Sequence, residues 1–289
     1  MPREGRTHAP EPRAATLDVP VAWACYDGIA DAYARVAAPR YFLPPARHLV
    51  GLLQPRPSER FLDVGCGTGV VAAEAAAVMG STRRVAGVDP APAMLAQARG
   101  AAVGLVAAGL PALPWRERCF DVAAGAFVLN HLADVPAALA EIRHLLRPGG
   151  RLGVSTWGRS PSQNPAGELW GRVASAFVDS RELRAALRQQ LPGEERLSEP
   201  AELAQELTAA GFAAEVAEVV PFAVTLSTDE YVESRLLSLG SRFIEHVLPA
   251  AEWRRFARSV RGTLRQAFGS ELVVETSVAF AVGRTPAAG

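Results

Sequence analysis

Short apolar runs alternate with amphipathic segments along the first part of the chain. Runs typical of buried strands occupy residues 61–64, 84–88, 103–107, 120–129 and 151–156. Between them lie segments with apolar residues at helical spacing, and Pro-Gly-Gly or single glycines end several of these segments. Strands that alternate with helices are typical of a parallel sheet covered on both faces. The pattern therefore predicts an α/β fold.

The second part of the chain follows another pattern. Residues 158–197 and 227–269 hold helical segments with aromatic residues on one face, whereas 214–226 and 272–282 are rich in β-forming residues. We therefore expect a Rossmann-like, doubly wound, mainly parallel seven-stranded sheet with a helical cap. The cap would come from two insertions among the last strands.

The predicted organisation follows from these patterns. Residues 1–16 are rich in Pro, Arg and Glu without an apolar stretch, which favours a disordered tail over a signal peptide. A helix with an aromatic face is expected over 21–38, ended by Pro39. The expected segments are a tail (1–16), N-terminal lid helices (17–57), the Rossmann-like core (58–157), a helical cap (158–197), a return to the core (198–226), a second helical insertion (227–269), and the last strand and tail (270–289).

A glycine-rich loop follows the first predicted strand. Gly65, Gly67 and Gly69 alternate with other residues before an alanine-rich helical segment. Glycine permits positive φ and lets a ligand lie against bare backbone, and the helix start offers amide donors. This pattern favours a nucleotide-like ligand. A dinucleotide fingerprint would place its third glycine at Val70, so a nicotinamide oxidoreductase is disfavoured.

Asp89 ends the second predicted strand, 24 positions after Gly65 (89 − 65). That spacing is close to the separation of about 20 residues between a glycine loop and a ribose-binding acid in a βαβ unit. Both residues then lie at carboxyl ends of adjacent strands. The alternative is a helix cap, because Pro90 follows and Met94 begins an apolar face.

Several motifs resemble those of the class I S-adenosylmethionine-dependent methyltransferases, in particular their small-molecule, ubiquinone/menaquinone-methyltransferase-like branch. They are the Asp63 acid with the G-x-G-x-G loop, the D-P-A-P-A-M-L-A-Q-A segment from Asp89, Leu113-Pro114-Trp115, the Phe120-Asp121 strand, and Leu145-Leu146-Arg147-Pro148-Gly149-Gly150-Arg151-Leu152. The resemblance covers about residues 26–156, and more loosely 199–211 and the last strand. It departs at Gly109, where the family commonly has an aspartate for the adenine amino group.

The resemblance implies S-adenosyl-L-methionine as the cofactor. The residues it implies for cofactor binding are Asp63, Gly65, Cys66, Gly67, Asp89, Pro90, Met94, Gly109, Leu110 and Asn130, with Tyr26 and Tyr33 on a lid helix. The implied activity is methyl transfer to a small, largely apolar molecule such as a secondary metabolite. An alternative is a protein of the same fold that only binds ligand or catalyses cyclisation or isomerisation.

His131 is the candidate general base, since imidazole titrates near neutral pH and the residue follows the fourth predicted strand. A histidine at a strand end also serves as a packing or capping residue. Trp157, Trp170 and Phe177 are the candidate substrate contacts because they are aromatic residues in or next to the expected cap.

Charge and cysteine content narrow the choice of partners. The 289-residue chain has 30 basic and 30 acidic residues, which disfavours nucleic acid as a main partner. Cys25, Cys66 and Cys119 are widely separated, so we expect free thiols and no metal site. No apolar stretch reaches the roughly 20 residues that cross a bilayer, so we expect a cytoplasmic protein without a membrane partner. The acceptor and the oligomeric state stay open.

Overall fold

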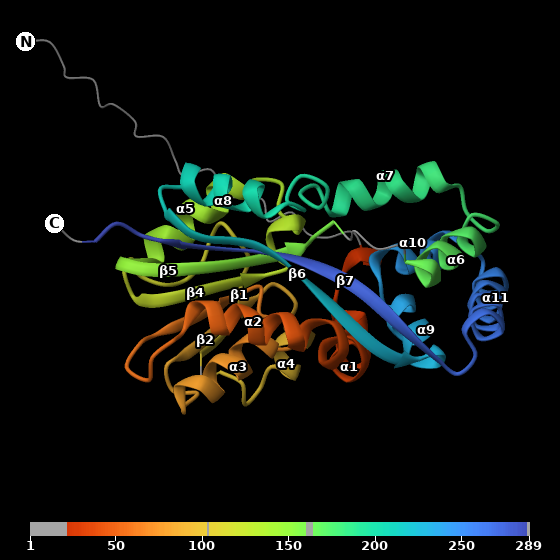
Figure 1. The fold of residues 1–289 in the computed structure, drawn as a ribbon, viewed down its shortest axis with the longest axis horizontal. Helices are drawn as coiled ribbons and strands as arrows, with labels where there is room; N and C mark the ends of the chain where they lie inside the picture. Colours follow the sequence, from red (N-terminus) through yellow and green to blue (C-terminus); the bar gives the residue numbers. More distant parts are fainter. Residues whose placement is uncertain (1–21, 103, 160–163, 288–289) are drawn as a thin grey trace, which may run out of the picture.

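The computed structural model describes residues 22–102, 104–159 and 164–287, so the expected tail at 1–16 lies outside the described residues. One seven-stranded sheet organises the chain, with strand order β3-β2-β1-β4-β5-β7-β6 (Figure 1). Its strands are β1 (Phe61–Val64), β2 (Val85–Asp89), β3 (Gly104–Ala107), β4 (Phe120–Ala126), β5 (Leu146–Trp157), β6 (Ala213–Ser227) and β7 (Glu271–Arg284).

The sheet is doubly wound, as the sequence predicted. Neighbouring strands from β3 to β5 run parallel, and β7 runs antiparallel to both β5 and β6. The strand order reverses between β1 and β4, and ligands bind outside the carboxyl ends of strands at such a point.

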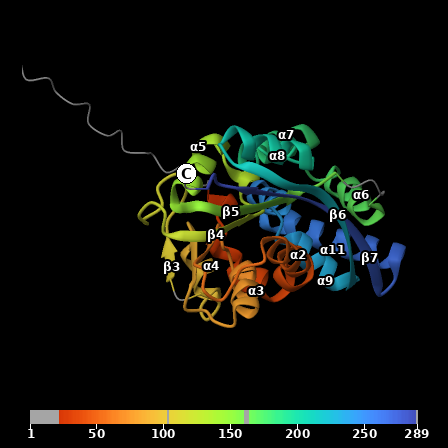
Figure 2. The same ribbon diagram turned by 60° about the vertical axis from the view of Figure 1, so that its left-hand side comes forward.

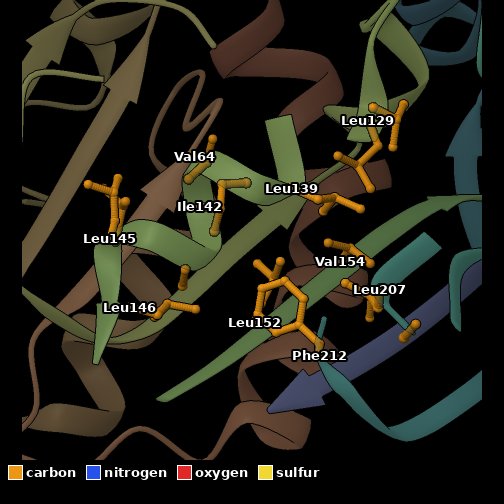
Figure 3. Packing of buried hydrophobic residues seen from close by; sticks show 14 of the residues in the cluster. Val64, Leu129, Leu139, Ile142, Leu145, Leu146, Leu152, Val154, Leu207 and Phe212 are labelled. Carbon is orange, nitrogen blue, oxygen red and sulfur yellow. The ribbon is translucent and has the colours of Figure 1, made fainter. Parts of the chain in front are cut away.

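Helices cover both faces of the sheet. α5 (Val135–Leu145) and α8 (Pro200–Ala209) lie on one face, and α2 (Leu43–Leu53) and α3 (Val70–Met79) lie on the other (Figure 2). Figure 3 shows the first interface, where Leu139 and Ile142 of α5 pack with Leu152 of β5. These side chains are fully buried, and each contributes roughly 1.5–3 kcal/mol of burial free energy.

β6 and β7 extend beyond the core and carry the cap (Figure 1). The cap helices are α6 (Pro165–Ala174), α7 (Ser180–Gln190), α9 (Thr228–Leu236), α10 (Leu239–Val247) and α11 (Ala250–Phe268). Phe256 and Val260 of α11 pack with Trp170 of α6 and with Val224 of β6. The two helical insertions thus share one apolar core.

The N-terminal segment differs from the predicted helix. Two 3-10 turns, Ala22–Ala24 and Asp27–Ile29, precede a helix that runs without a break through α1 (Ala30–Ala32), the π-helical segment Tyr33–Phe42 and α2. The prediction that Pro39 ends the helix was wrong. Pro39 lies inside the π-helical segment, and such widened turns accommodate a residue that lacks an amide hydrogen.

The fourth strand is shorter than predicted. It ends at Ala126, because Phe127 adopts a left-handed φ of 56° and turns the chain into the 3-10 turn Leu129–His131. The fifth strand is longer and starts at Leu146. Pro148 and the two glycines end α5 without preventing the chain from joining the sheet.

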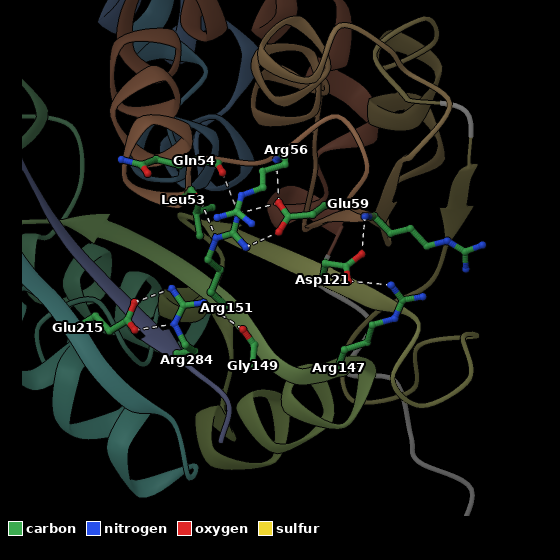
Figure 4. Close-up of polar contacts among 11 residues, drawn as sticks. Leu53, Gln54, Arg56, Glu59, Asp121, Arg147, Gly149, Arg151, Glu215 and Arg284 are labelled. Carbon is green, nitrogen blue, oxygen red and sulfur yellow. Dashed lines mark hydrogen bonds and ion pairs between the residues drawn. The ribbon is translucent and has the colours of Figure 1, made fainter. Parts of the chain in front are cut away.

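Ion pairs connect neighbouring segments at the end of the sheet where the parallel strands begin (Figure 4). The Arg151 guanidinium donates to the carbonyl oxygens of Leu53 and Gln54 and pairs with Glu59 at 2.8 Å. Arg284 pairs with Glu215, and Arg147 with Asp121. Within the described ranges, no helix is both long and apolar enough to cross a membrane.

Candidate cofactor and acceptor site

The glycine loop joins β1 to α3 at the carboxyl edge of the sheet. Gly65, Gly67 and Gly69 all have positive φ, at 64°, 51° and 80°. A Cβ on Gly65 would lie 2.5 Å from a methyl group of Val128, and one on Gly69 would lie 2.9 Å from Cβ of Ala98. A Cβ on Gly67 would meet no described atom within 4 Å. Gly67 is therefore the glycine whose backbone faces open space.

Asp63 lies beneath this loop. Its side chain is 1% exposed, and Oδ2 accepts a hydrogen bond from the Ala72 amide in the first turn of α3. Burial raises the pKa of Asp63 to about 8, and the nearby Asp89 carboxylate adds to the rise. Asp63 thus fixes the loop against the helix, and no described cation lies beside it to lower that pKa.

Asp89 ends β2 beside the loop. Its Oδ2 accepts from the Gly67 amide at 2.8 Å and its Oδ1 accepts from the Ala91 amide at 2.9 Å. Burial raises the pKa of Asp89, although these two hydrogen bonds oppose the rise. The carboxylate therefore both turns the chain into α4 (Pro92–Gln97) and lies next to the open backbone of Gly67.

The N-terminal segment covers this corner. Tyr26 and Tyr33 pack against Met94 of α4, and their rings lie edge to face with centroids 6.1 Å apart. The Asp27 carboxylate accepts from the Ala93 amide at 2.7 Å, which holds the segment on α4. Both tyrosines are half-buried, and burial raises their pKa values.

Other predicted residues lie around the same corner. Cys66 is buried, its amide donates to the Val88 carbonyl, and burial raises the pKa of its thiol. Pro90 is exposed at the start of α4. Gly109 and Leu110 follow β3, where the Ala108 amide donates to the Asp89 carbonyl.

Asn130 and His131 lie in the turn after β4. Asn130 is 3% exposed, and its Oδ1 has no hydrogen-bond partner among the described residues. The His131 ring lies edge to face with Tyr26, with centroids 5.9 Å apart. Burial, with a contribution from the Arg242 charge, lowers the pKa of His131 to about 4, so its imidazole is neutral at pH 7.

The three predicted substrate residues are separated. Trp157, at the end of β5, packs on Phe127 and borders a cavity of about 420 Å³ that Glu194 and Ser198 also line. Trp170 and Phe177 instead contact Phe256 in the core of the cap. The structure gives those two a packing role and does not bring them to the strand ends.

Arg242 is a site residue that sequence reasoning missed. It comes from α10, is 6% exposed, and its Nη1 donates to the Cys25 carbonyl at 2.7 Å. Its Cζ lies 4.6 Å from the centroid of the Tyr26 ring. In the sequence it is one arginine in an amphipathic helix, so nothing local marks it as part of this site.

The residues present fit S-adenosylmethionine. The open backbone at Gly67 and the carboxylate of Asp89 offer surfaces for an amino acid and a ribose, and the buried Thr68 hydroxyl has no described partner. In the part of the chain that the structure describes, no three His, Cys, Asp or Glu side chains are placed to hold a metal ion. The fold and this site define the class I methyltransferase type of protein.

Comparison with known proteins agrees with this class. Residues 62–154 match the family model described as "Methyltransferase domain". Nocamycin O-methyltransferase of Saccharothrix syringae is 31% identical over 269 residues, which cover 86% of this chain and 93% of the relative. The chain therefore belongs to the S-adenosylmethionine-dependent methyltransferases, and S-adenosylmethionine is its cofactor.

Two further similarities concern parts of the molecule or the fold alone. Aklanonic acid methyltransferase DauC of Streptomyces sp. (strain C5) is 34% identical over 140 residues, 45% of this chain and 62% of the relative. The crystal structure of the [4+2]-cyclase SpnF superposes with a TM-score of 0.54 at 18% identity, covering 91% of this chain and 95% of that one.

Proposed function

We propose that this enzyme transfers a methyl group from S-adenosylmethionine to an oxygen atom of a small, largely apolar secondary metabolite. The relatives named as nocamycin O-methyltransferase and aklanonic acid methyltransferase support this acceptor class. The cavity of about 420 Å³ beside Trp157 has the size of a small-molecule site and lies at the carboxyl edge of the sheet.

One observation carries the proposal: Gly67 and Asp89 are joined by a hydrogen bond at the strand ends, beneath the lid that bears Tyr26 and Tyr33. We assign the ribose to Asp89 and the amino-acid part to the loop at Gly67, with Asp63 fixing that loop. Met94, Pro90 and Leu110 would border the adenine, and Gly109 would offer it backbone only.

When bound, S-adenosylmethionine supplies an electrophilic methyl group on sulfur. The protein's task is then to hold the acceptor at near-attack distance and to exclude water, which can lower the barrier by several kcal/mol. Tyr26, Tyr33 and Trp157 provide the enclosing surface. Neutral His131, in the turn after β4, lies edge to face with Tyr26 and can accept a proton.

The test uses purified protein with trideuteromethyl S-adenosylmethionine and a panel of phenols, alcohols and carboxylic acids that includes aklanonic acid. Mass spectrometry of the products should show one labelled methyl group on an acceptor. Asp89→Ala should abolish the transfer, and Glu215→Gln, in an exposed ion pair with Arg284, should not. Binding of the cofactor without any labelled product would contradict the proposal.

A product with the mass of its substrate would instead favour a second function, rearrangement or cyclisation on the same fold. The likeness to a [4+2]-cyclase in fold, and the glycine at position 109, motivate that reading. The same mass measurement separates the two functions, since only methyl transfer adds the label.

A further inference from the structure

Arg242 is a buried arginine that forms no ion pair with any carboxylate in the described part of the chain. Its Nη1 donates to the Cys25 carbonyl and the Tyr26 side chain interacts with the guanidinium, whereas Nε and Nη2 have no hydrogen-bond partner within the described residues. A guanidinium carries five N–H donors and stays charged in proteins. Burying such a group without an anion costs several kcal/mol, so structures normally pair it.

The aromatic groups next to this guanidinium are neutral at pH 7, and the Asp89 and Glu194 carboxylates, which act on Tyr26, form no ion pair with it. Tyr26 lies beneath it, and Tyr26 and Tyr33 both have raised pKa values because they are buried. His131 has its pKa lowered, by burial and then by Arg242, and is uncharged. The Arg242 guanidinium is therefore surrounded mainly by aromatic side chains, and no described carboxylate pairs with it.

The position of Arg242 connects the cap to the strand ends. Its helix, α10, packs on the N-terminal segment, where Phe243 meets Trp23 with ring centroids 5.3 Å apart. Tyr26, which lies under Arg242, also contacts His131 in the turn after β4. Next to His131 is Asn130, whose Oδ1 has no partner among the described residues. The arginine thus belongs to the inserted part of the chain, whereas Asp63, Gly67 and Asp89 belong to the βα core.

From this geometry we propose that Arg242 binds the carboxylate of the acceptor, and that the acceptor class is a carboxylic acid methylated to its ester. The inference rests on the function proposed above and narrows it. An arginine matches a carboxylate with two parallel hydrogen bonds, which fixes the orientation of the acid. The guanidinium also favours the ionised form, the form that attacks.

The reaction balances without a general base. A carboxylate oxygen forms the new bond to the methyl carbon, the carbon–sulfur bond breaks with its electron pair going to sulfur, and no proton moves. His131 then positions the acid through a hydrogen bond. Its low pKa suits this role, because a second positive charge beside Arg242 would be repelled.

A carboxylate also occurs in the amino-acid part of the cofactor, so the test must separate the two sources. The variants are Arg242→Met and Arg242→Lys, with Arg258→Met on the exposed side of α11 as a control that removes a surface charge. Calorimetry first compares S-adenosylhomocysteine with 5′-methylthioadenosine, which lacks the amino-acid part. We expect Arg242→Met to change both affinities by less than about threefold. A selective loss of S-adenosylhomocysteine binding would assign Arg242 to the cofactor and overturn the proposal.

The second arm titrates protein saturated with S-adenosylhomocysteine with 2-naphthoate and with 2-naphthamide. We expect the wild type and Arg258→Met to bind the acid, and Arg242→Met to weaken that binding at least about tenfold, as the loss of charge-assisted hydrogen bonds does. Arg242→Lys should retain part of it, and the amide should bind weakly to every protein. Equal binding of acid and amide, or no binding of the acid, would overturn the proposal. Methyl transfer to neutral acceptors would still leave the wider function standing.

Discussion

Two buried arginines at opposite ends of the sheet differ in how many hydrogen bonds their guanidinium groups make. At the end where the parallel strands begin, Arg151 is 9% exposed and uses all three of its nitrogens in hydrogen bonds to Glu59 and to two carbonyl oxygens. At the carboxyl ends of the strands, Arg242 is 6% exposed and uses one nitrogen. All the guanidinium nitrogens of Arg151 are thus hydrogen-bonded, whereas two of those of Arg242 have no partner among the described residues.

This difference extends to the neighbouring groups. Asn130 and Thr68 also have buried oxygens without a partner among the described residues, and both lie near the glycine loop or the turn after β4. Further atoms of this kind lie in the cap, at Tyr231 and Arg235. Folded proteins rarely leave buried polar groups without partners, so at the strand ends we expect a ligand to complete the bonding. We infer that the ion pairs where the parallel strands begin stabilise the fold, and that the carboxyl ends of the strands form the ligand-binding site.

The largest expected contrast is between Arg151→Met and Arg242→Met. Removing Arg151 leaves Glu59 and two carbonyl oxygens without their partner, which should lower the free energy of unfolding by about 3–5 kcal/mol. Removing Arg242 relieves an unpaired charge and loses one hydrogen bond, so the change should stay within about 1 kcal/mol. Urea unfolding measures both. Adding Glu59→Gln to Arg151→Met should recover part of the loss, and equal losses for the two single variants would break the comparison.

The acids at the two ends should titrate in opposite senses. Although burial opposes it, hydrogen bonds from Arg151 and Arg56 lower the pKa of Glu59, so its contribution to stability is lost as the pH falls. Burial raises the pKa of Asp63 to about 8, so its contribution is present in acid and lost between about pH 4 and pH 8.

Asp63→Asn should therefore become more stable relative to the wild type as the pH rises through that window. After allowance for relaxation of the site, the gain should be on the order of 2–3 kcal/mol. Urea unfolding of both proteins at several pH values measures it. Stability curves that run parallel from pH 4 to pH 8 would show that Asp63 is ionised throughout.

Asp89→Asn tests the ligand role of the second end. The amide keeps the size of the side chain but loses its charge, and we expect S-adenosylhomocysteine affinity to fall about 30-fold, or about 2 kcal/mol. Calorimetry measures the affinity, with Asp121→Asn, next to Arg147 at the opposite end, as the matched control. A similar loss of affinity in the control would remove the distinction between the two ends.

Two alanine substitutions in the glycine loop separate packing from ligand access, and Gly67→Ala gives the smallest expected change in stability. Gly65→Ala should lower the unfolding free energy, because its Cβ meets Val128, and Gly67→Ala should cost about 1 kcal/mol for its left-handed φ alone. Gly67→Ala should instead weaken S-adenosylhomocysteine binding, because its Cβ enters the open space. Thermal unfolding and calorimetry together separate the two; unchanged affinity in Gly67→Ala would mean that no ligand approaches there.

The proposed cofactor half of the site rests on local signals in the sequence. The glycine loop, Asp63 and Asp89 lie at the ends of short apolar strands, and the parallel arrangement of β1 and β2 brings them together. The spacing between Gly65 and Asp89 was enough to infer that both lie at the carboxyl ends of adjacent strands. Pro39 shows the limit of such rules, because a π-helical turn tolerates the proline that normally ends a helix.

The proposed acceptor half could not be predicted from the sequence because it depends on contacts between distant segments. Arg242 meets Cys25 across 217 positions of sequence, and no pattern in α10 indicates which face it turns to the site. The aromatic faces of α6 and the segment after it looked like substrate contacts, but Trp170 and Phe177 turn towards Phe256. Periodicity identifies a buried face without identifying what buries it.

Hydrogen exchange with and without S-adenosylhomocysteine tests the distinction between the two ends most directly. The account predicts slower exchange in the lid at 26–33, the loop at 65–72 and the turn at 89–94. It predicts unchanged exchange at 53–60 and 147–151, where the ion pairs are already complete. Protection around Arg151, or none around Gly67 and Asp89, would contradict the account.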